Sequence, residues 1–270
     1  MGRKIQIACA ASGLLMIALY GFGVVAFARM IPANSPEKRA AAVVASYGEN
    51  LTGIRIGMSM VMFGCALMIT WGAAVATQTR RGAPEHPILF HIQVACAVTA
   101  CMNGIMLSLA GGLAAFRQNA VSSEITQALN DLFWLLWTVP GTSFEVWTLA
   151  AGVAILLDHR ARPVFPRWSG YFSILVAMSF LPGVMALFFT SGPFAYNGMF
   201  PWWIPTVMFF LWALVMTPLT FAAIRNEPDL DDRSAGGITD PAVIAAFARL
   251  RAELGAPAAG GPVGAGHEAR

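Results

Sequence analysis

The sequence predicts an all-α, polytopic membrane protein of about six transmembrane helices in three hairpins, with short amphipathic surface helices. Hydrophobic residues make up 57% of the 270 residues, and charged residues only 11%. Soluble domains carry roughly 25% charged residues, which they need to cover a surface that faces water. A surface that faces lipid has no such need, and six apolar segments of roughly 20 residues or more account for most of this chain.

The apolar segments alternate with short polar loops. We place the six spans at about residues 5–31, 56–77, 88–116, 132–157, 170–190 and 204–224. The first follows Arg3 and Lys4 and contains Ala26-Phe27-Ala28, which has the pattern of a signal-peptide cleavage site. Because its apolar run is far longer than the roughly 7–15 residues of a signal-peptide core, we interpret it as a membrane anchor.

Two short amphipathic helices are predicted between spans on the same side of the bundle. Ser35 can cap the first, with Pro36 in its first turn, and Gly48 can end it. The second has Ser123 as its cap and an apolar stripe that reaches Leu132, where the fourth span begins. We expect both helices to lie on the membrane surface.

The distribution of basic residues predicts the orientation. The side of a membrane protein that is richer in Lys and Arg in short loops faces the cytoplasm. The richer side receives Arg3, Lys4, Arg80, Arg81, Arg160, Arg162, Arg167 and Arg225, and the other side receives Arg29, Lys38, Arg39, Arg55 and Arg117. We therefore expect a protein of the bacterial inner (cytoplasmic) membrane with both termini in the cytoplasm.

The chain is expected to divide into a transmembrane bundle (residues 1–225) and a cytoplasmic tail (residues 226–270). In the tail, Asp240-Pro241 opens a short helix over about 241–254, which Gly255 ends. The rest of the tail is rich in Ala, Gly and Pro, a composition typical of disorder.

Glu145 lies near the middle of the fourth span, deeper than any other acidic residue. A carboxyl group at this depth costs about 2.5 kcal/mol or more, and such residues usually face the bundle interior and mark functional sites. Thr138 and Thr142 share its helix face. Pro140 and Gly141 interrupt the helix beside it, and Pro140 leaves a backbone carbonyl that needs a partner within the protein. Glu145 is interpreted either as a general acid or base, or as a structural hydrogen-bonding residue.

The third span supplies the expected partner of Glu145. Asn103 lies at a similar depth in this adjacent, antiparallel helix, so we expect Glu145 to point into the bundle and approach it. Gln93 and Cys96 share a face of the span with Asn103. The predicted site therefore consists of one catalytic candidate, Glu145, and four ligand-binding candidates: Asn103, Thr138, Thr142 and Gln93.

No cofactor or metal site is predicted, and no nucleic-acid partner. His86 and His91 are five residues apart, which is a poor helical spacing for two ligands of one ion. The four cysteines lie inside apolar segments without a CxxC pair and are interpreted as small packing residues. Walker, HExxH and GxSxG motifs are missing from the sequence. The basic residues flank the spans, where they set orientation.

The aromatic turn at residues 192–203 and the span after it resemble a stretch of uncharacterised bacterial multi-span integral membrane proteins. The resemblance implies a membrane bundle and brings no activity with it. The leading hypothesis is a non-enzymatic protein that binds or passes a small lipophilic or amphipathic molecule, alone or as an accessory subunit beside a membrane-protein partner. The alternatives are an intramembrane enzyme that acts on a lipophilic substrate through Glu145, and a structural assembly subunit.

Overall fold

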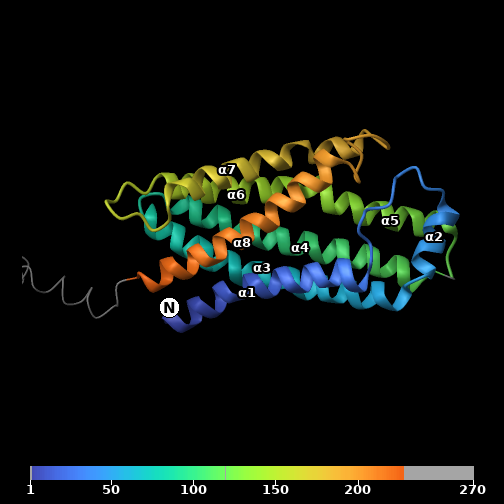
Figure 1. Ribbon diagram of the computed structural model, residues 1–270, viewed down its shortest axis with the longest axis horizontal. Helices are drawn as coiled ribbons and strands as arrows, with labels where there is room; N and C mark the ends of the chain where they lie inside the picture. Colours follow the sequence, from blue (N-terminus) through green and yellow to red (C-terminus); the bar gives the residue numbers. More distant parts are fainter. Residues whose placement is uncertain (1, 119, 228–270) are drawn as a thin grey trace, which may run out of the picture. The chain divides into compact units, whose positions relative to one another are not determined.

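The computed structural model describes residues 2–118 and 120–227, and every regular element in these residues is a helix (Figure 1). Six helical segments are long and apolar enough to cross a membrane: Arg3–Phe27, Leu51–Gly82, Pro87–Phe116, Ser123–Leu156, Arg167–Leu187 and Met199–Arg225. The predicted all-α polytopic membrane fold is thereby confirmed. The helix predicted over 241–254 lies outside the described residues.

Four of the six segments are not uniform α-helices. The two uniform ones are α3 (Leu51–Gly82) and α4 (Pro87–Phe116). The first span joins α1 (Arg3–Gly21) to the π-helical η1 (Phe22–Phe27), and the fourth joins α5 (Ser123–Thr138) to α6 (Thr142–Leu156) through the 3-10 turn η2 (Val139–Gly141). The fifth span joins α7 (Arg167–Phe180) to the 3-10 turns of η3 (Leu181–Leu187). The sixth joins the π-helical η4 (Met199–Trp203) to α8 (Ile204–Arg225).

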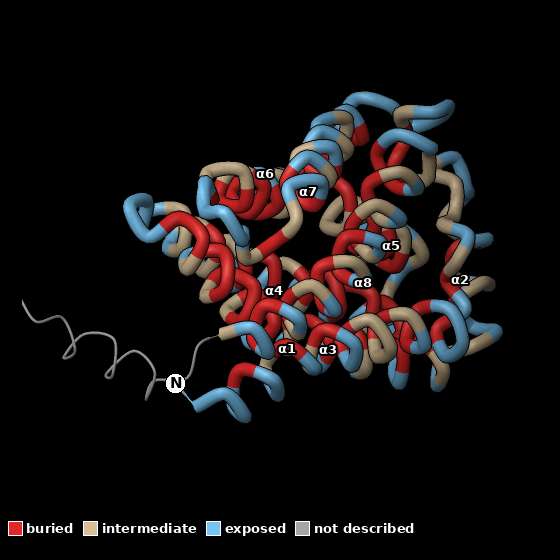
Figure 2. Tube along the Cα trace, turned by 60° about the vertical axis from the view of Figure 1, so that its left-hand side comes forward, coloured by how far each residue is buried: buried red, intermediate tan, exposed pale blue. Residues whose placement is uncertain are grey.

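Helix α3 lies at the centre of the bundle, in contact with α1, α4, α6 and α8. Its Trp71 is fully buried, and its ring contacts Trp147 of α6 and Trp212 of α8 at centroid distances of 5.7 and 5.3 Å. The indole N–H of Trp71 donates to Thr217 of α8 (3.0 Å), and that of Trp212 donates to Ser173 of α7 (2.9 Å). Buried residues accordingly concentrate on the helix faces that look inward (Figure 2).

The second predicted short helix is not a separate element, because it continues directly into the fourth span. The fourth span is one continuous segment that starts at Ser123. Its first part, α5, packs against α4 and buries Phe133 and Trp134 completely. The apolar stripe that suggested a surface helix faces away from the neighbouring helices, because Ile125 and Leu132 are exposed while Phe133 and Trp134 are buried.

The first short helix is α2 (Ala40–Gly48), which begins later than predicted. The Ser35 hydroxyl accepts a hydrogen bond from the backbone N–H of Glu37 (3.3 Å) in the turn before α2, and does not cap the helix. α2 packs on α5 and buries Val43 and Tyr47. Its apolar face therefore covers protein.

The two groups of basic residues lie at opposite ends of the bundle (Figure 1). At one end, Arg3 donates a hydrogen bond to the carbonyl of Arg225, and Arg81 donates to the carbonyl of Ala223 (3.0 Å). At the other end, Arg55 donates to the carbonyl of Ala115 (3.0 Å). In each case an arginine satisfies a carbonyl in the last turn of a helix, where no intrahelical N–H is available.

The loop between α6 and α7 is organised by the buried carboxylate of Asp158. It accepts hydrogen bonds from the Arg160 side chain (2.9 Å) and from the backbone N–H of Val164 (2.8 Å). It also lies so close to Gly82 that a Cβ there would be 2.9 Å from a carboxylate oxygen. Burial raises the pKa of Asp158, but the hydrogen bonds from Arg160 and Val164 outweigh it, so that the pKa is lowered overall.

We predict that Asp158→Asn destabilises the solubilised protein at pH 7 by about 1–3 kcal/mol, because buried donors lose their charged acceptor. The folded-state pKa lies below the unfolded value of about 3.9. The stabilisation is therefore present above about pH 4 and is lost as the pH falls through the lowered pKa. Thermal unfolding at pH 7 and pH 3 should show a melting-temperature difference that shrinks at the lower pH. The exposed neighbour provides the control, His159→Gln, and equal melting temperatures for Asp158→Asn and wild type at pH 7 would contradict the prediction.

Candidate functional site

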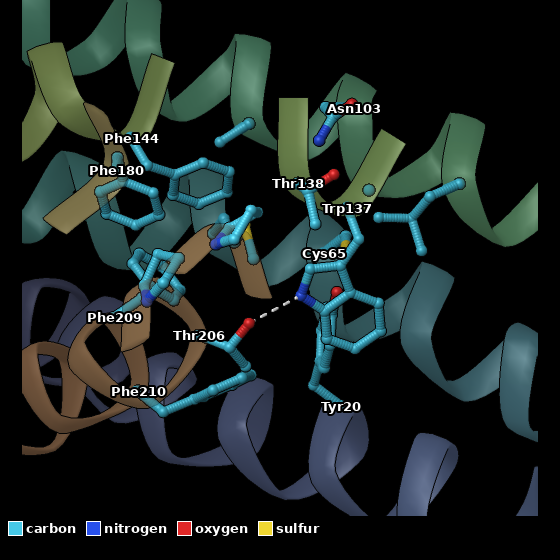
Figure 3. A pocket seen from close by; sticks show the side chains of 16 residues that line it. Tyr20, Cys65, Asn103, Trp137, Thr138, Phe144, Phe180, Thr206, Phe209 and Phe210 are labelled. Carbon is cyan, nitrogen blue, oxygen red and sulfur yellow. Dashed lines mark hydrogen bonds between the residues drawn. The ribbon is translucent and has the colours of Figure 1, made fainter. Parts of the chain in front are cut away.

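A cavity of about 40 Å³ lies inside the bundle between α1, α3, α4, α5, α6, α7 and α8 (Figure 3). A water molecule needs roughly 10–15 Å³ of such space, so the cavity has room for about three waters or for a small chemical group. Most of its wall is apolar, and four residues add hydroxyl or amide groups: Tyr20, Asn103, Thr138 and Thr206. None of the described residues that line it carries a charge.

The cavity lies where the irregular segments of different spans meet. Tyr20 precedes η1, Thr138 precedes η2, Phe180 precedes η3, and Pro205 follows η4; all four line the cavity. η2 contacts η3, and η3 contacts η4. The approach is close, because a Cβ at Gly183 in η3 would lie 2.5 Å from the carbonyl oxygen of Thr138.

Asn103 satisfies the backbone carbonyl that Pro140 leaves without a partner. In an unbroken α-helix the carbonyl of Leu136 would accept from the N–H of residue 140, and proline has none. The side-chain amide of Asn103, from α4, donates to this carbonyl at 3.0 Å. The carbonyl that the break in the fourth span leaves free is therefore satisfied by a side chain of the third span, as a helix interruption inside a membrane requires.

The other ligand-binding candidates fall into two groups. Thr138 lines the cavity, and its hydroxyl donates to the carbonyl of Trp134 (3.1 Å) in its own helix. Gln93 is buried but does not line the cavity; its amide donates to Thr79 of α3 (3.0 Å). Thr142 is exposed. The structure thus brings Asn103 and Thr138 together at one cavity, apart from Gln93 and Thr142.

Glu145 lies on α6 at the border between the buried and the exposed face. Its side chain is half-buried, whereas Thr142 and Leu149, one turn before and after it, are exposed. Within the described residues its carboxyl group has no hydrogen bond or ion pair, and it does not line the cavity. The amide of Asn103, its expected partner, donates to Leu136. A catalytic role of Glu145 stays a prediction.

Sequence reasoning did not single out Tyr20, Trp137 and Thr206. The Tyr20 ring packs edge-to-face against Trp137 at 5.2 Å and against Phe210 at 5.3 Å. The indole N–H of Trp137 donates to the hydroxyl of Thr206 (3.0 Å), which joins α5 to α8 across the cavity wall (Figure 3). The signal that could have found them is the position of Tyr20, a large polar-tipped residue deep in an apolar span.

A second polar cluster lies at the middle of α5, where Asp131 contacts the aromatic turn before η4. The hydroxyl of Tyr196 donates to Asp131 (3.0 Å), and the amide of Asn130 donates to the same oxygen (3.3 Å). Tyr47 of α2 donates to Asn130 (3.4 Å). Burial, together with the charge of Asp131, raises the pKa of Tyr196, so that its hydroxyl stays protonated and donates. The cluster connects α2 and the turn to α5.

Neither a metal site in the described residues nor a related protein of known function helps to interpret this cavity. In the part of the chain that the structure describes, no three His, Cys, Asp or Glu side chains gather as a metal ion would require, and all four cysteines are free. Comparison with models of protein families, with curated proteins and with solved structures finds no match to this chain.

We predict that Asn103→Leu destabilises the protein by about 0.6–1.7 kcal/mol, which are the average and the largest values found for hydrogen bonds between membrane helices. The loss should be smaller in a Pro140→Ala background, because alanine at this position restores the N–H that pairs with the Leu136 carbonyl. Unfolding in mixed micelles, measured on the wild type, both single variants and the double variant, gives the coupling.

A matched control is Ser108→Ala, which removes a hydroxyl whose hydrogen bond to Gly104 stays within α4. This substitution should cost the same in the wild-type and the Pro140→Ala backgrounds. If Asn103→Leu behaves like Ser108→Ala and shows no coupling to position 140, Asn103 does not act through the helix break.

Proposed function

We propose that the protein binds, or passes through the bilayer interior, a small lipophilic or amphipathic molecule, and that the cavity at the helix breaks is the binding site. The observation that carries the proposal is the meeting of four interrupted spans around an apolar cavity with a few hydrogen-bonding groups. Sites for small molecules are typically of this composition. Interrupted helices at mid-membrane are a recurring way to build such sites in transporters.

One part of the bundle is held by extensive ring packing, and another part, at the cavity, is held by fewer contacts. Trp71, Trp147 and Trp212 hold α3, α6 and α8 together through ring contacts. At the cavity, by contrast, α5 and α8 are joined through one hydrogen bond between Trp137 and Thr206. The sixth span begins with η4 and continues into α8, and Pro205 lacks the backbone N–H that would link the two elements in a continuous helix. The protein acts in this way alone or as an accessory subunit of a membrane assembly.

The cavity proposal predicts that Ala100→Val lowers the amount of lipophilic molecule that co-purifies with the protein. Ala100 is fully buried in α4 and lines the cavity, so a larger side chain there occupies space that the ligand needs. Val98→Leu is the control, because Val98 is exposed on the same helix. Mass spectrometry of solvent extracts from equal amounts of protein measures the bound molecules. Equal amounts in all three proteins would contradict the proposal.

We further propose that the protein resides in the bacterial inner membrane with both termini in the cytoplasm. The support is that the end of the bundle with Arg3, Arg81 and Arg225 belongs to the side richer in basic residues. Alkaline phosphatase and green fluorescent protein fused in turn to each terminus should be inactive and fluorescent, respectively. Phosphatase activity at either terminus would overturn this orientation.

A further inference from the structure

The hydroxyl of Tyr20 is a hydrogen-bond donor that the fold leaves without a partner. The residue lines the cavity and is only 6% exposed, yet its hydroxyl makes no hydrogen bond within residues 2–118 and 120–227. The hydroxyl borders the cavity, so a water or a ligand there can supply the missing hydrogen bond. In native structures buried polar groups usually find a protein atom, a water or a ligand.

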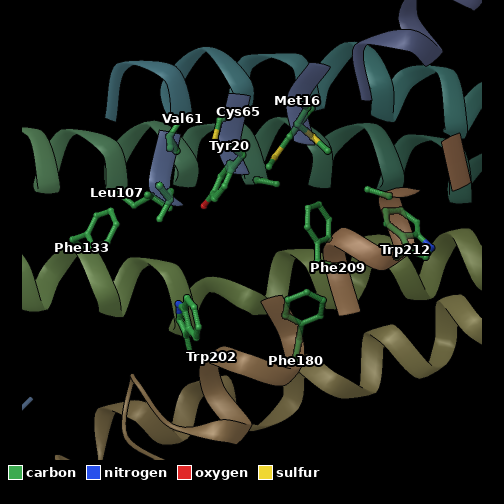
Figure 4. Close-up of a cluster of buried hydrophobic side chains, with 14 of the residues drawn as sticks. Met16, Tyr20, Val61, Cys65, Leu107, Phe133, Phe180, Trp202, Phe209 and Trp212 are labelled. Atoms are coloured by element: carbon green, nitrogen blue, oxygen red, sulfur yellow. The ribbon is translucent and has the colours of Figure 1, made fainter. Parts of the chain in front are cut away.

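The surroundings of Tyr20 fix the direction of its hydroxyl. Trp137 and Phe210 both contact the ring edge-to-face, on the α5 and α8 sides of the cavity. Figure 4 shows the hydroxyl oxygen pointing away from α1 and α3, toward the opposite layer that contains Trp202 and Phe180. A ring held in this way presents a pre-positioned donor, and a ligand that accepts its hydrogen bond does not have to order the side chain first.

The cavity also limits the charge of its occupant. Its hydrogen-bonding groups are hydroxyls, an amide, the indole N–H of Trp137 and the thiol of Cys65, and none of them carries a charge as a permanent ion. An ionised carboxylate, phosphate or ammonium group would lose its hydration here without gaining an opposite charge, which is strongly unfavourable. Moving a neutral oxygen atom from water into the cavity costs far less free energy, and one good hydrogen bond compensates for this cost.

We propose that Tyr20 recognises the polar end of the molecule in the cavity, and that this end is a neutral oxygen acceptor: the hydroxyl of an alcohol or the carbonyl of an aldehyde or ketone. The inference rests on the proposed function and names the chemical class of its ligand. Thr206 is the second contact, because its hydroxyl accepts from Trp137 and keeps its own proton for donation. The volume of about 40 Å³ admits this polar end. The hydrocarbon part requires the side chains of the wall to move apart.

The test compares four probes that share a ten-carbon chain: decan-1-ol, decan-2-one, decane and decanoate. Ligand-dependent shifts of the thermal unfolding midpoint give the affinity of each probe for the solubilised wild type and for Tyr20→Phe. Phenylalanine keeps the ring and removes only the hydroxyl. Tyr171→Phe is the matched control, because Tyr171 is an exposed residue of α7. Partitioning of the probes into micelles is the same for all variants and cancels in the comparison.

We expect decan-1-ol and decan-2-one to bind the wild type and Tyr171→Phe about three- to tenfold more tightly than Tyr20→Phe, the factor that corresponds to one net hydrogen bond. Decane should bind all three proteins alike, and decanoate no better than decane. If the oxygenated probes bind Tyr20→Phe as tightly as the wild type, the role of Tyr20 is overturned while the cavity proposal stands. If none of the four probes binds the wild type, both are overturned.

Discussion

The membrane interior contains no water to pair with exposed backbone groups, and this constraint shapes the middle of the protein. A proline inside a transmembrane helix leaves a carbonyl that must be satisfied by another part of the protein. The fourth span contains Pro140, and the amide of Asn103 from the third span reaches the carbonyl of Leu136. The hydrogen bond fixes α4 against the α5–α6 junction, and the cavity forms beside this junction because an interrupted helix cannot fill its own side of the bundle.

The remaining breaks are accommodated by close packing. Gly183 of η3 lies directly against the carbonyl of Thr138, and a Cβ at Gly141 would meet the ring of Phe180 at 3.0 Å. Small residues are favoured between membrane helices for the same reason: without a hydrophobic driving force in lipid, association depends on close contact. Large aromatic residues then fill the space further along the bundle. Trp147 is buried without a hydrogen-bond partner for its indole N–H among the described residues, so its position depends on ring packing alone.

The sequence was sufficient for the number of spans and their approximate limits, because a long apolar run has few alternatives to crossing a membrane. The sequence was insufficient where the same residue pattern suits a helix in two different surroundings. The apolar stripe after Ser123 is what a helix on the membrane surface requires, and equally what the exposed face of a spanning helix requires. The freed carbonyl at Pro140 and the polar Asn103 were both predicted, but depth along a helix does not fix rotation about its axis. The pairing of Asn103 with Leu136 could therefore be identified only from the three-dimensional structure.

The contrast between Glu145 and Tyr20 shows why depth in a span is an incomplete guide to a site. Glu145 is the deepest acidic residue in the sequence, but it lies at the edge of the exposed face of α6. Tyr20 carries no charge, but it is almost completely buried and lines the cavity. The charged contacts of the bundle, such as Arg81 with Ala223 and Arg55 with Ala115, lie near helix ends, where headgroups and water are within reach. The cavity wall, in contrast, carries no charged side chain among the described residues, so the ligand that we propose would have to enter it in a neutral form.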